Sequence, residues 1–259
     1  MLAKTLVRPS QLMLSNMGAV GSRVIRQLRR DPRFVAIALV MPVLIMYMLF
    51  LFFDGVDAPI FDPKKFVVPI GAFMVHFITY ALCAIVLVRE RTTQTLSRMF
   101  ISGYRQIEIV GGYLIAYSIL ATLQSLIVLV GLNLLFKLDY GLGTFVIIYG
   151  VIWMLAMLSI ALGMFVSNFA RNEGQVMPMI PLVIMISVFF SGMLLPIEKL
   201  PEFIRGVRYL TPMFYANEGI QALIAKGAQV GDAVGSLLGL GLYGVILLTL
   251  AAGTLRERD

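Results

Sequence analysis

Six apolar runs, each long enough to cross a lipid bilayer, constrain what this chain of 259 residues can fold into. They cover residues 34–53, 66–88, 109–136, 142–166, 176–195 and 234–255. About 20 helical residues cross ~30 Å of hydrocarbon, and a helix satisfies its own backbone hydrogen bonds where lipid tails offer none. Since 59% of the residues are hydrophobic and only 14% are charged, the sequence predicts an all-α polytopic membrane protein with six transmembrane helices, in a domain over residues 34–259.

The segment before the first run, residues 1–33, is polar to amphipathic. Met13, Met17, Val20, Val24 and Leu28 recur at spacings of three and four, which places them on one face of a helix. Four arginines occupy the remaining faces: Arg23, Arg26, Arg29 and Arg30. This pattern predicts an N-terminal amphipathic helix that lies at the membrane interface.

The distribution of basic residues predicts an orientation in the membrane. Fourteen of the 21 Lys and Arg residues lie in segments on the same side as the N-terminus, and seven lie on the other side. Because positive charge favours the cytoplasmic side, we expect both termini to be cytoplasmic. The connection between spans two and three, residues 89–108, is then cytoplasmic, and the one between spans five and six, residues 196–232, is external.

These two connections carry more pattern than ordinary loops. In the first, Leu96, Met99 and Phe100 share one helical face, and Gly103 interrupts the helix. In the second, prolines and charged residues alternate with apolar and aromatic ones, which is typical of short helices at a membrane face. We therefore expect an amphipathic cytoplasmic helix and short re-entrant external helices.

The sequence lacks the usual catalytic and nucleotide-binding patterns. It contains no GxxxxGK[ST], HExxH, CxxC or GxSxG, and its single His76 and single Cys83 lie within apolar runs. We expect no catalytic residue, no metal site and no cofactor bound by this chain. Its charged residues lie in loops or at span ends, which argues against an ion-coupled pump, and its basic residues flank apolar runs, which argues against nucleic acid.

The two patterned connections resemble the permease subunit of type-2 ATP-binding-cassette (ABC) exporters. The matching positions of the first connection are Glu90, Arg91, Thr95, Leu96, Arg98, Glu108, Ile109 and Gly112, and those of the second are Ser191, Gly192, Pro196, Leu200, Pro201, Pro212, Tyr215 and Glu218. The chain departs from the family pattern at Thr92, Gln94, Ser97, Gly103, Tyr113 and Gln221.

The resemblance implies a machine with several subunits in the plasma (inner) membrane of a bacterium or archaeon. Two copies of a separate cassette ATPase would bind ATP and Mg, and this chain would pair with a second permease subunit, most simply as a homodimer. The residues implied in ATPase coupling are Glu90, Arg91, Thr95, Leu96, Arg98, Gly103 and Glu108. The eight matching positions of the second connection would form an external gate.

The same resemblance places the transport pathway between spans two and five of paired subunits. The candidate lining residues are Phe73, His76, Phe77, Tyr80, Met185, Phe189 and Phe190. For His76 a hydrogen bond between packed helices is favoured over a proton relay. Gln124 and Asn133 are also expected to bond between helices, and Gly235 and Gly239 are expected to allow close helix packing.

The cargo expected from this pathway is an amphipathic or hydrophobic small molecule, either a drug-like compound or a lipid, because Met and aromatic side chains suit variable apolar ligands. The alternative is a polysaccharide or lipid-linked glycan, for which a single Trp153 offers few aromatic contacts. Two readings from other classes are a membrane-embedded lipid-modifying enzyme, which would need clustered carboxylates or histidines, and a purely structural or assembly subunit.

Overall fold

The computed structural model describes residues 9–55, 63–226 and 230–255. The remaining parts of the predicted segments, residues 1–8, 56–62, 227–229 and 256–259, lie outside the described residues. In order, the described helices are α1 (Pro9–Arg30), α2 (Pro32–Gly55), α3 (Pro63–Thr92), α4 (Thr95–Ile101), α5 (Gln106–Phe136), α6 (Leu142–Ser167), α7 (Glu173–Phe190), the 3₁₀ helix η1 (Ile197–Lys199), α8 (Glu202–Arg205), the 3₁₀ helix η2 (Gly206–Leu210), α9 (Pro212–Lys226) and α10 (Val230–Thr254).

The predicted all-α architecture is confirmed. Six described helices, α2, α3, α5, α6, α7 and α10, are long and apolar enough to span a bilayer. The predicted end of the fifth span at residue 195 is wrong, because α7 ends at Phe190. There the Ser191 hydroxyl donates to the Val188 carbonyl at 2.9 Å, and Gly192 turns the chain with a left-handed φ of 75°.

Helices α3 and α6 form the centre of the bundle, and α2 and α7 lie at its periphery with broad apolar faces exposed. Gly163 of α6 lies directly against α3, since a Cβ added there would come within 2.8 Å of the Tyr80 carbonyl oxygen. Small side chains at such crossings allow helix backbones to approach closely, which is how spans associate in lipid.

Polar side chains inside the bundle bond from helix to helix. His76 on α3 lies 2.8 Å from the Ser159 hydroxyl of α6 through Nδ1 and 3.2 Å from the Ser187 hydroxyl of α7 through Nε2. Thr79 donates to Gln124 Oε1 on α5 at 2.9 Å. The expected interhelical bonds of His76 and Gln124 are thus confirmed, and they cross-link α3 to three neighbouring helices. The same expectation for Asn133 is not confirmed, because its buried Oδ1 has no hydrogen-bond partner.

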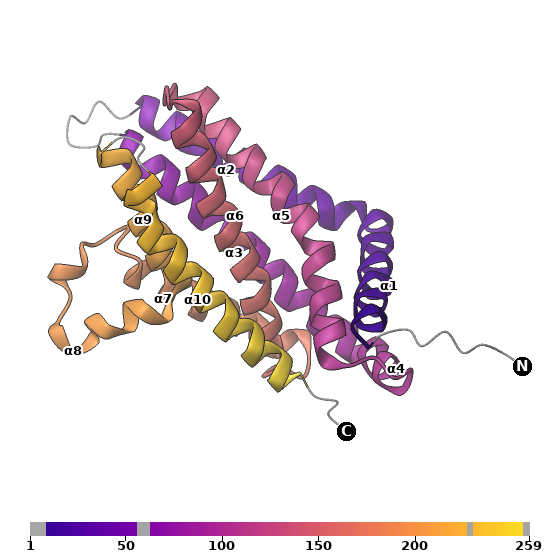
Figure 1. Cartoon of the computed structure of the whole chain (residues 1–259). Coiled ribbons are helices and arrows are strands. Elements are labelled where there is room, and N and C mark those ends of the chain that lie inside the picture. Colours follow the sequence, from indigo (N-terminus) through magenta and orange to yellow (C-terminus); the bar gives the residue numbers. More distant parts are fainter. Residues whose placement is uncertain (1–8, 56–62, 227–229, 256–259) are drawn as a thin grey trace, which may run out of the picture.

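The two patterned connections lie at opposite ends of the bundle. Figure 1 shows α1, α4 and the last turns of α10 at one end, and α9 near the other, with α8 projecting to the side. We call the end that contains α1 and α4 the α4 end. There, Gln106 Nε2 at the start of α5 donates to the Leu255 carbonyl just after α10 at 2.6 Å, which joins α5 to α10.

Candidate functional site

The expected amphipathic helix in residues 89–108 is present as α4. Leu96 and Met99 are buried and Phe100 is half-buried, whereas Arg98 is exposed. Gly103, with a φ of 86°, ends the helix in a Schellman motif: the Tyr104 amide donates to the Met99 carbonyl at 3.1 Å and the Gly103 amide to the Phe100 carbonyl at 2.9 Å. Helix α4 is therefore a short, well-terminated helix held down by its apolar face.

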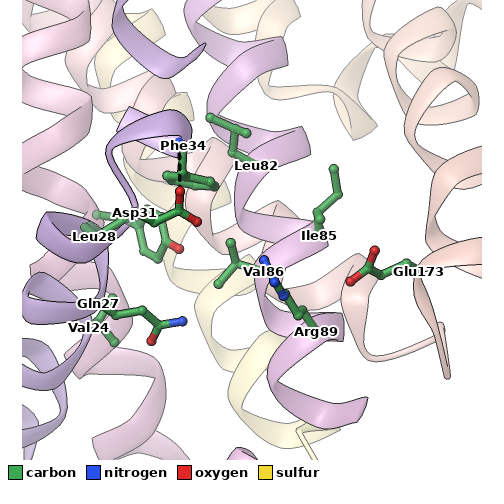
Figure 2. A pocket seen from close by; sticks show the side chains of 11 residues that line it. Val24, Gln27, Leu28, Asp31, Phe34, Leu82, Ile85, Val86, Arg89 and Glu173 are labelled. Atoms are coloured by element: carbon green, nitrogen blue, oxygen red, sulfur yellow. Dashed lines mark hydrogen bonds between the residues drawn. The ribbon is translucent and has the colours of Figure 1, made fainter. Parts of the chain in front are cut away.

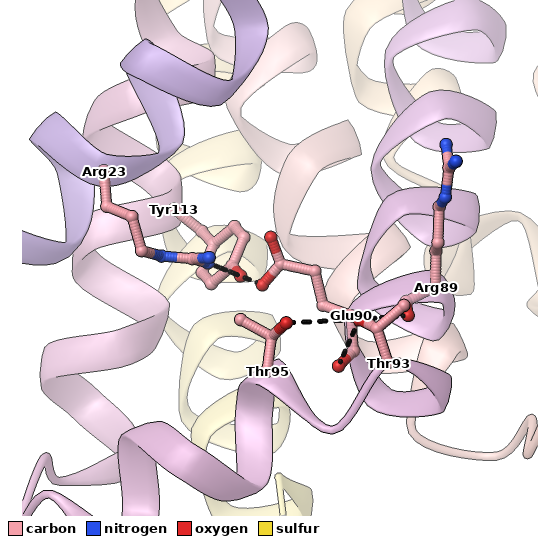
Figure 3. A network of polar contacts seen from close by, with 6 residues as sticks. All are labelled: Arg23, Arg89, Glu90, Thr93, Thr95 and Tyr113. Carbon is pink, nitrogen blue, oxygen red and sulfur yellow. Dashed lines mark hydrogen bonds and ion pairs between the residues drawn. The ribbon is translucent and has the colours of Figure 1, made fainter.

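A partly buried ion pair joins α1 to the end of α3, next to α4. Arg23 Nη2 of α1 lies 2.6 Å from Glu90 Oε2, and it also donates to the Tyr113 hydroxyl of α5 at 2.8 Å (Figure 3). The Glu90 side chain is only 4% exposed. Sequence analysis grouped Arg23 with the other arginines on the polar faces of α1, but this residue points into the protein.

Helix α1 packs on α5 more closely than an interfacial helix resting on lipid requires. A Cβ added at Gly112 would lie 2.5 Å from the Val20 Cβ, and one at Gly111 would lie 1.8 Å from the Met17 methyl group. Glu108 strengthens this contact, since it accepts from Asn16 Nδ2 at 3.0 Å and from the Arg105 amide at 2.9 Å. Glu108 thus caps α5 and anchors α1 at once.

Arg91 ties the end of α3 to the end of α6. Its guanidinium donates to the Ser167 and Ala170 carbonyls and to Asn168 Oδ1 at 2.9 Å. Asn168 Nδ2 in turn donates to Thr254 Oγ1 of α10 at 2.9 Å. Asn168 was not predicted, because its position after an apolar run carries no signal of a bond to Thr254, 86 residues away.

The predicted coupling residues therefore have two kinds of environment. Glu90, Arg91 and Glu108 form polar contacts between helices, and Leu96 lies on the buried face of α4. Arg98 is exposed, and Thr95 is half-buried, with its Oγ1 3.1 Å from Thr93 Oγ1. Helix α4 therefore has an exposed face that carries Arg98 and a buried face that packs on the bundle.

The predicted external gate residues surround a small apolar cluster. Ile197, Leu200 and Phe214 are buried together, with Phe190 and Tyr215 packed against them. Pro212 is buried at the start of α9, whereas Pro196 and Pro201 are exposed at the starts of η1 and α8. Proline suits such first positions because its fixed φ and missing N–H cost nothing there.

We call residues 196–226 the gate segment, after the predicted external gate. Hydrogen bonds hold this segment against the end of α7 and against α10. Asn217 of α9 donates to the Ser191 carbonyl at 3.0 Å, and Tyr243 of α10 donates to the Leu210 carbonyl at 2.8 Å. Burial, with Tyr209 and Glu218 nearby, raises the pKa of the Tyr215 hydroxyl. The Tyr215 hydroxyl donates to the Tyr209 carbonyl at 3.4 Å.

The charged residues of the gate segment mostly bond within it. Arg205 donates to the Leu200 and Glu198 carbonyls at 2.8 and 2.7 Å, and the Arg208 guanidinium lies 4.6 Å from the centre of the Tyr209 ring. Glu218 is exposed on α9.

The two glycines expected to allow close packing around α10 differ. The expectation for Gly239 is confirmed, because a Cβ there would lie 2.5 Å from the Tyr215 ring. The expectation for Gly235 is wrong, because open space surrounds that position.

Replacing Gly192 with Ala is expected to destabilise the gate segment by about 1–2 kcal/mol, since a side chain is disfavoured at a φ of 75° and would press on Ile197 at 3.3 Å. Thermal unfolding of the purified protein in detergent measures the effect. Gly206→Ala is the matched control, because a Cβ there meets nothing within 4 Å. Equal melting temperatures of the two variants would contradict the assignment.

The candidate pathway residues divide between the bundle interior and its surface. His76 and Tyr80 are fully buried, and Phe73 stacks on Phe77 with ring centres 6.3 Å apart. Phe77, Met185 and Phe189 are exposed, and Phe190 is half-buried in the gate cluster. Because α7 packs on α3, the candidate residues of α3 and those of α7 lie on adjoining helices.

The described residues contain no cluster of His, Cys, Asp or Glu that could hold a metal ion. The polar groups at the α4 end connect helices instead.

Comparison with known families and proteins matches residues 15–225 to the ABC-2 type transporter family. The chain is 26% identical over 171 residues to the linearmycin resistance permease protein LnrN of Bacillus subtilis, covering 64% of this chain and 42% of that protein. It is 22% identical over 197 residues to the probable multidrug ABC transporter permease YbhR of Escherichia coli, covering 76% of this chain and 52% of that protein. The chain thus spans about half the length of the curated relatives it matches.

Proposed function

Because this chain belongs to the ABC-2 type transporter family, we propose that it is the transmembrane permease of an exporter that moves an amphipathic or hydrophobic small molecule out of the cytoplasm or inner leaflet. Hydrolysis of ATP on two copies of a separate cassette ATPase would drive transport. The chain is an integral membrane protein of the bacterial plasma membrane, with six apolar helices.

The observation that carries this proposal is the set of contacts between α4 and the bundle. Helix α4 follows directly on α3, its apolar face is buried, and the neighbouring Arg23–Glu90 pair holds α1 against the same helix end. Arg91 and Asn168 extend the connection to α6 and α10. A partner that pushes on α4 would therefore tilt several spans together instead of bending a loop, which is what coupling to ATP hydrolysis requires.

Two lines of support favour a small apolar cargo over a glycan. The relatives are named for resistance to linearmycin and for multidrug transport. In this chain, Phe77, Met185 and Phe189 offer exposed aromatic and thioether groups on adjoining spans, which suit variable apolar ligands. The exposed apolar faces of α2 and α7 would contact lipid and a second permease subunit, with the α4 end in the cytoplasm.

The test is reconstitution of the purified chain in liposomes, with and without a cassette ATPase encoded beside it. The chain alone is expected to hydrolyse no ATP. Arg98→Ala is expected to lower ATP-driven export of a fluorescent amphiphile about tenfold, as a lost charge-assisted contact with the ATPase would. Arg171→Ala, which removes another exposed cation at the α4 end, should leave export unchanged.

ATP hydrolysis by the chain alone would overturn the proposal. Export that Arg98→Ala leaves at the level of the unsubstituted protein would remove α4 from the coupling path. A coupled complex that moves only lipid-linked glycans would keep the coupling and replace the cargo.

A further inference from the structure

Two adjoining cavities lie where α1 turns into α2 and where α3 ends. The first, of about 280 Å³, has mostly apolar walls that include Leu28, Phe34, Leu82, Ile85, Val86 and Tyr117 (Figure 2). The second, of about 540 Å³, is lined by four arginines, Arg23, Arg26, Arg30 and Arg89. Gln27, Asp31 and Arg89 line both, so an apolar chamber and a cationic one share a wall.

The cationic cavity has an excess of positive charge. Its four arginines face two carboxylates, Asp31 and Glu90, which leaves an excess of two. Glu90 is bound by Arg23, and Asp31 Oδ1 accepts from the Phe34 amide at 3.2 Å and so caps α2. Figure 3 shows the Arg89 side chain extending away from the Arg23–Glu90 pair. Among the described residues, Arg26, Arg30 and Arg89 make no ion pair.

Two acidic residues of the apolar cavity influence where an anion would bind. Asp31 lines both cavities, and Glu173, at the start of α7, lines the apolar one. Against the single cation Arg89, these two carboxylates leave the apolar cavity with an excess of one negative charge, whereas the cationic cavity has an excess of two positive charges. A phosphate is therefore directed to the cationic cavity, where it meets Arg26 and Arg30 of α1 and the shared Arg89.

The position of the cavities along the bundle corresponds to the membrane boundary. Arg30 ends α1 and Pro32 begins the first span, while Arg89 lies in the last turn of the second. The apolar walls come from residues further into the spans, Leu82 and Ile85 on α3 and Tyr117 on α5. Charge at the boundary and an apolar chamber beside it match the two halves of a lipid molecule.

We propose that the two cavities form a binding site for one anionic phospholipid of the leaflet at the α4 end. Its phosphate binds Arg26, Arg30 and Arg89, whose guanidinium groups suit phosphate oxygens, and one acyl chain enters between α3 and α5. Acidic groups on a soluble partner would satisfy the arginines but would leave the apolar chamber empty. This inference requires only that the chain spans a membrane, and it holds whether or not the chain exports cargo.

The test is native mass spectrometry of the purified chain in detergent, titrated with dioleoyl phosphatidylglycerol and, separately, with dioleoyl phosphatidylcholine. We expect one phosphatidylglycerol to bind with clear preference. The double variant Arg30→Gln/Arg89→Gln should weaken its binding about 30-fold, or about 2 kcal/mol, at ~1 kcal/mol for each basic residue. Arg33→Gln, which removes an exposed cation that lines neither cavity, should leave the affinity unchanged.

The apolar chamber is tested with ligands of different length and with a filling substitution. Dihexanoyl phosphatidylglycerol and inorganic phosphate should bind at least tenfold more weakly than the dioleoyl lipid. Ile85→Phe, which narrows the chamber, should weaken the long-chain lipid and leave the short-chain one unchanged. Melting temperatures of all variants without lipid separate lost binding from lost folding, and a variant that melts early is replaced by Ile85→Met.

Three results would overturn the proposal. Equal affinity for inorganic phosphate and dioleoyl lipid would make the site one for free anions. Equal weakening by Arg33→Gln would reduce it to general surface charge. A double variant that keeps its full affinity for phosphatidylglycerol would show that Arg30 and Arg89 do not bind the lipid phosphate. These measurements use the chain without ATPase, so their outcome is independent of the export assay.

Discussion

Replacing Arg23 with Met is expected to lower the stability of the protein by about 3 kcal/mol, because it leaves the Glu90 carboxylate buried without its cation. The Glu90 side chain is 4% exposed while that of Arg23 is 33% exposed, so the expected loss falls at the low end of the range for buried pairs. The Tyr113 hydroxyl loses the same guanidinium as a partner. Thermal unfolding in detergent measures the change, and Arg29→Met, at an exposed position of α1, serves as the control.

The double variant Arg23→Met/Glu90→Gln separates folding from coupling. Removing both charges relieves the buried carboxylate, so stability should recover by most of the amount that the single variant lost. ATP-driven export, measured in liposomes that contain the cassette ATPase, should be lower than that of the unsubstituted protein in both the single and the double variant. The reason is that α1 no longer holds the end of α3 through an ion pair. A double variant that regains both stability and export would show that the pair stabilises the fold without transmitting motion.

Replacing Gly163 with Ala is expected to be among the most damaging small substitutions in the bundle. The added Cβ would lie 2.8 Å from the Tyr80 carbonyl oxygen, 2.9 Å from the Cys83 Cβ and 3.0 Å from the Ala84 amide nitrogen. Two of these atoms belong to the α3 backbone, which cannot turn aside as a flexible side chain can. The two central helices must separate, at a cost of about 3 kcal/mol.

The same helix provides the control for this substitution. A Cβ at Gly150 of α6 meets nothing within 4 Å, so Gly150→Ala should change the melting temperature little, or raise it slightly through the better helix propensity of Ala. Gly163→Ala should melt well below it. Because α3 also carries the candidate pathway residues Phe73 and Phe77, export should fall with stability. Similar melting temperatures for both variants would show that α3 and α6 approach less closely than described.

Local patterns in the sequence predicted much of the candidate site and missed its connections. The apolar spacing of Leu96, Met99 and Phe100 and the break at Gly103 predicted α4, because an amphipathic helix and its glycine stop are encoded within a few residues. The partner of Glu90 was not predictable, since Arg23 lies 67 residues away and has the same local context as three other arginines. The paired cavities at Arg89 likewise depend on helices that only folding brings together.

The sequence by itself determined the number and type of the spans. A bilayer contains no water to bond the backbone, so an apolar run long enough to cross it folds as a transmembrane helix. It also predicted Gln124 and His76 as bonds between helices, since a polar group in lipid needs a partner. Only the tertiary structure decided which partners they meet, that α7 stops at Phe190, and that Arg23 points inward while Arg30 and Arg89 face a cavity. The reason is that the apolar and polar faces of a helix are encoded within a few residues. The approach of two helices instead depends on close packing at glycines such as Gly112 and Gly163, which contact a side chain or a backbone from a distant part of the chain.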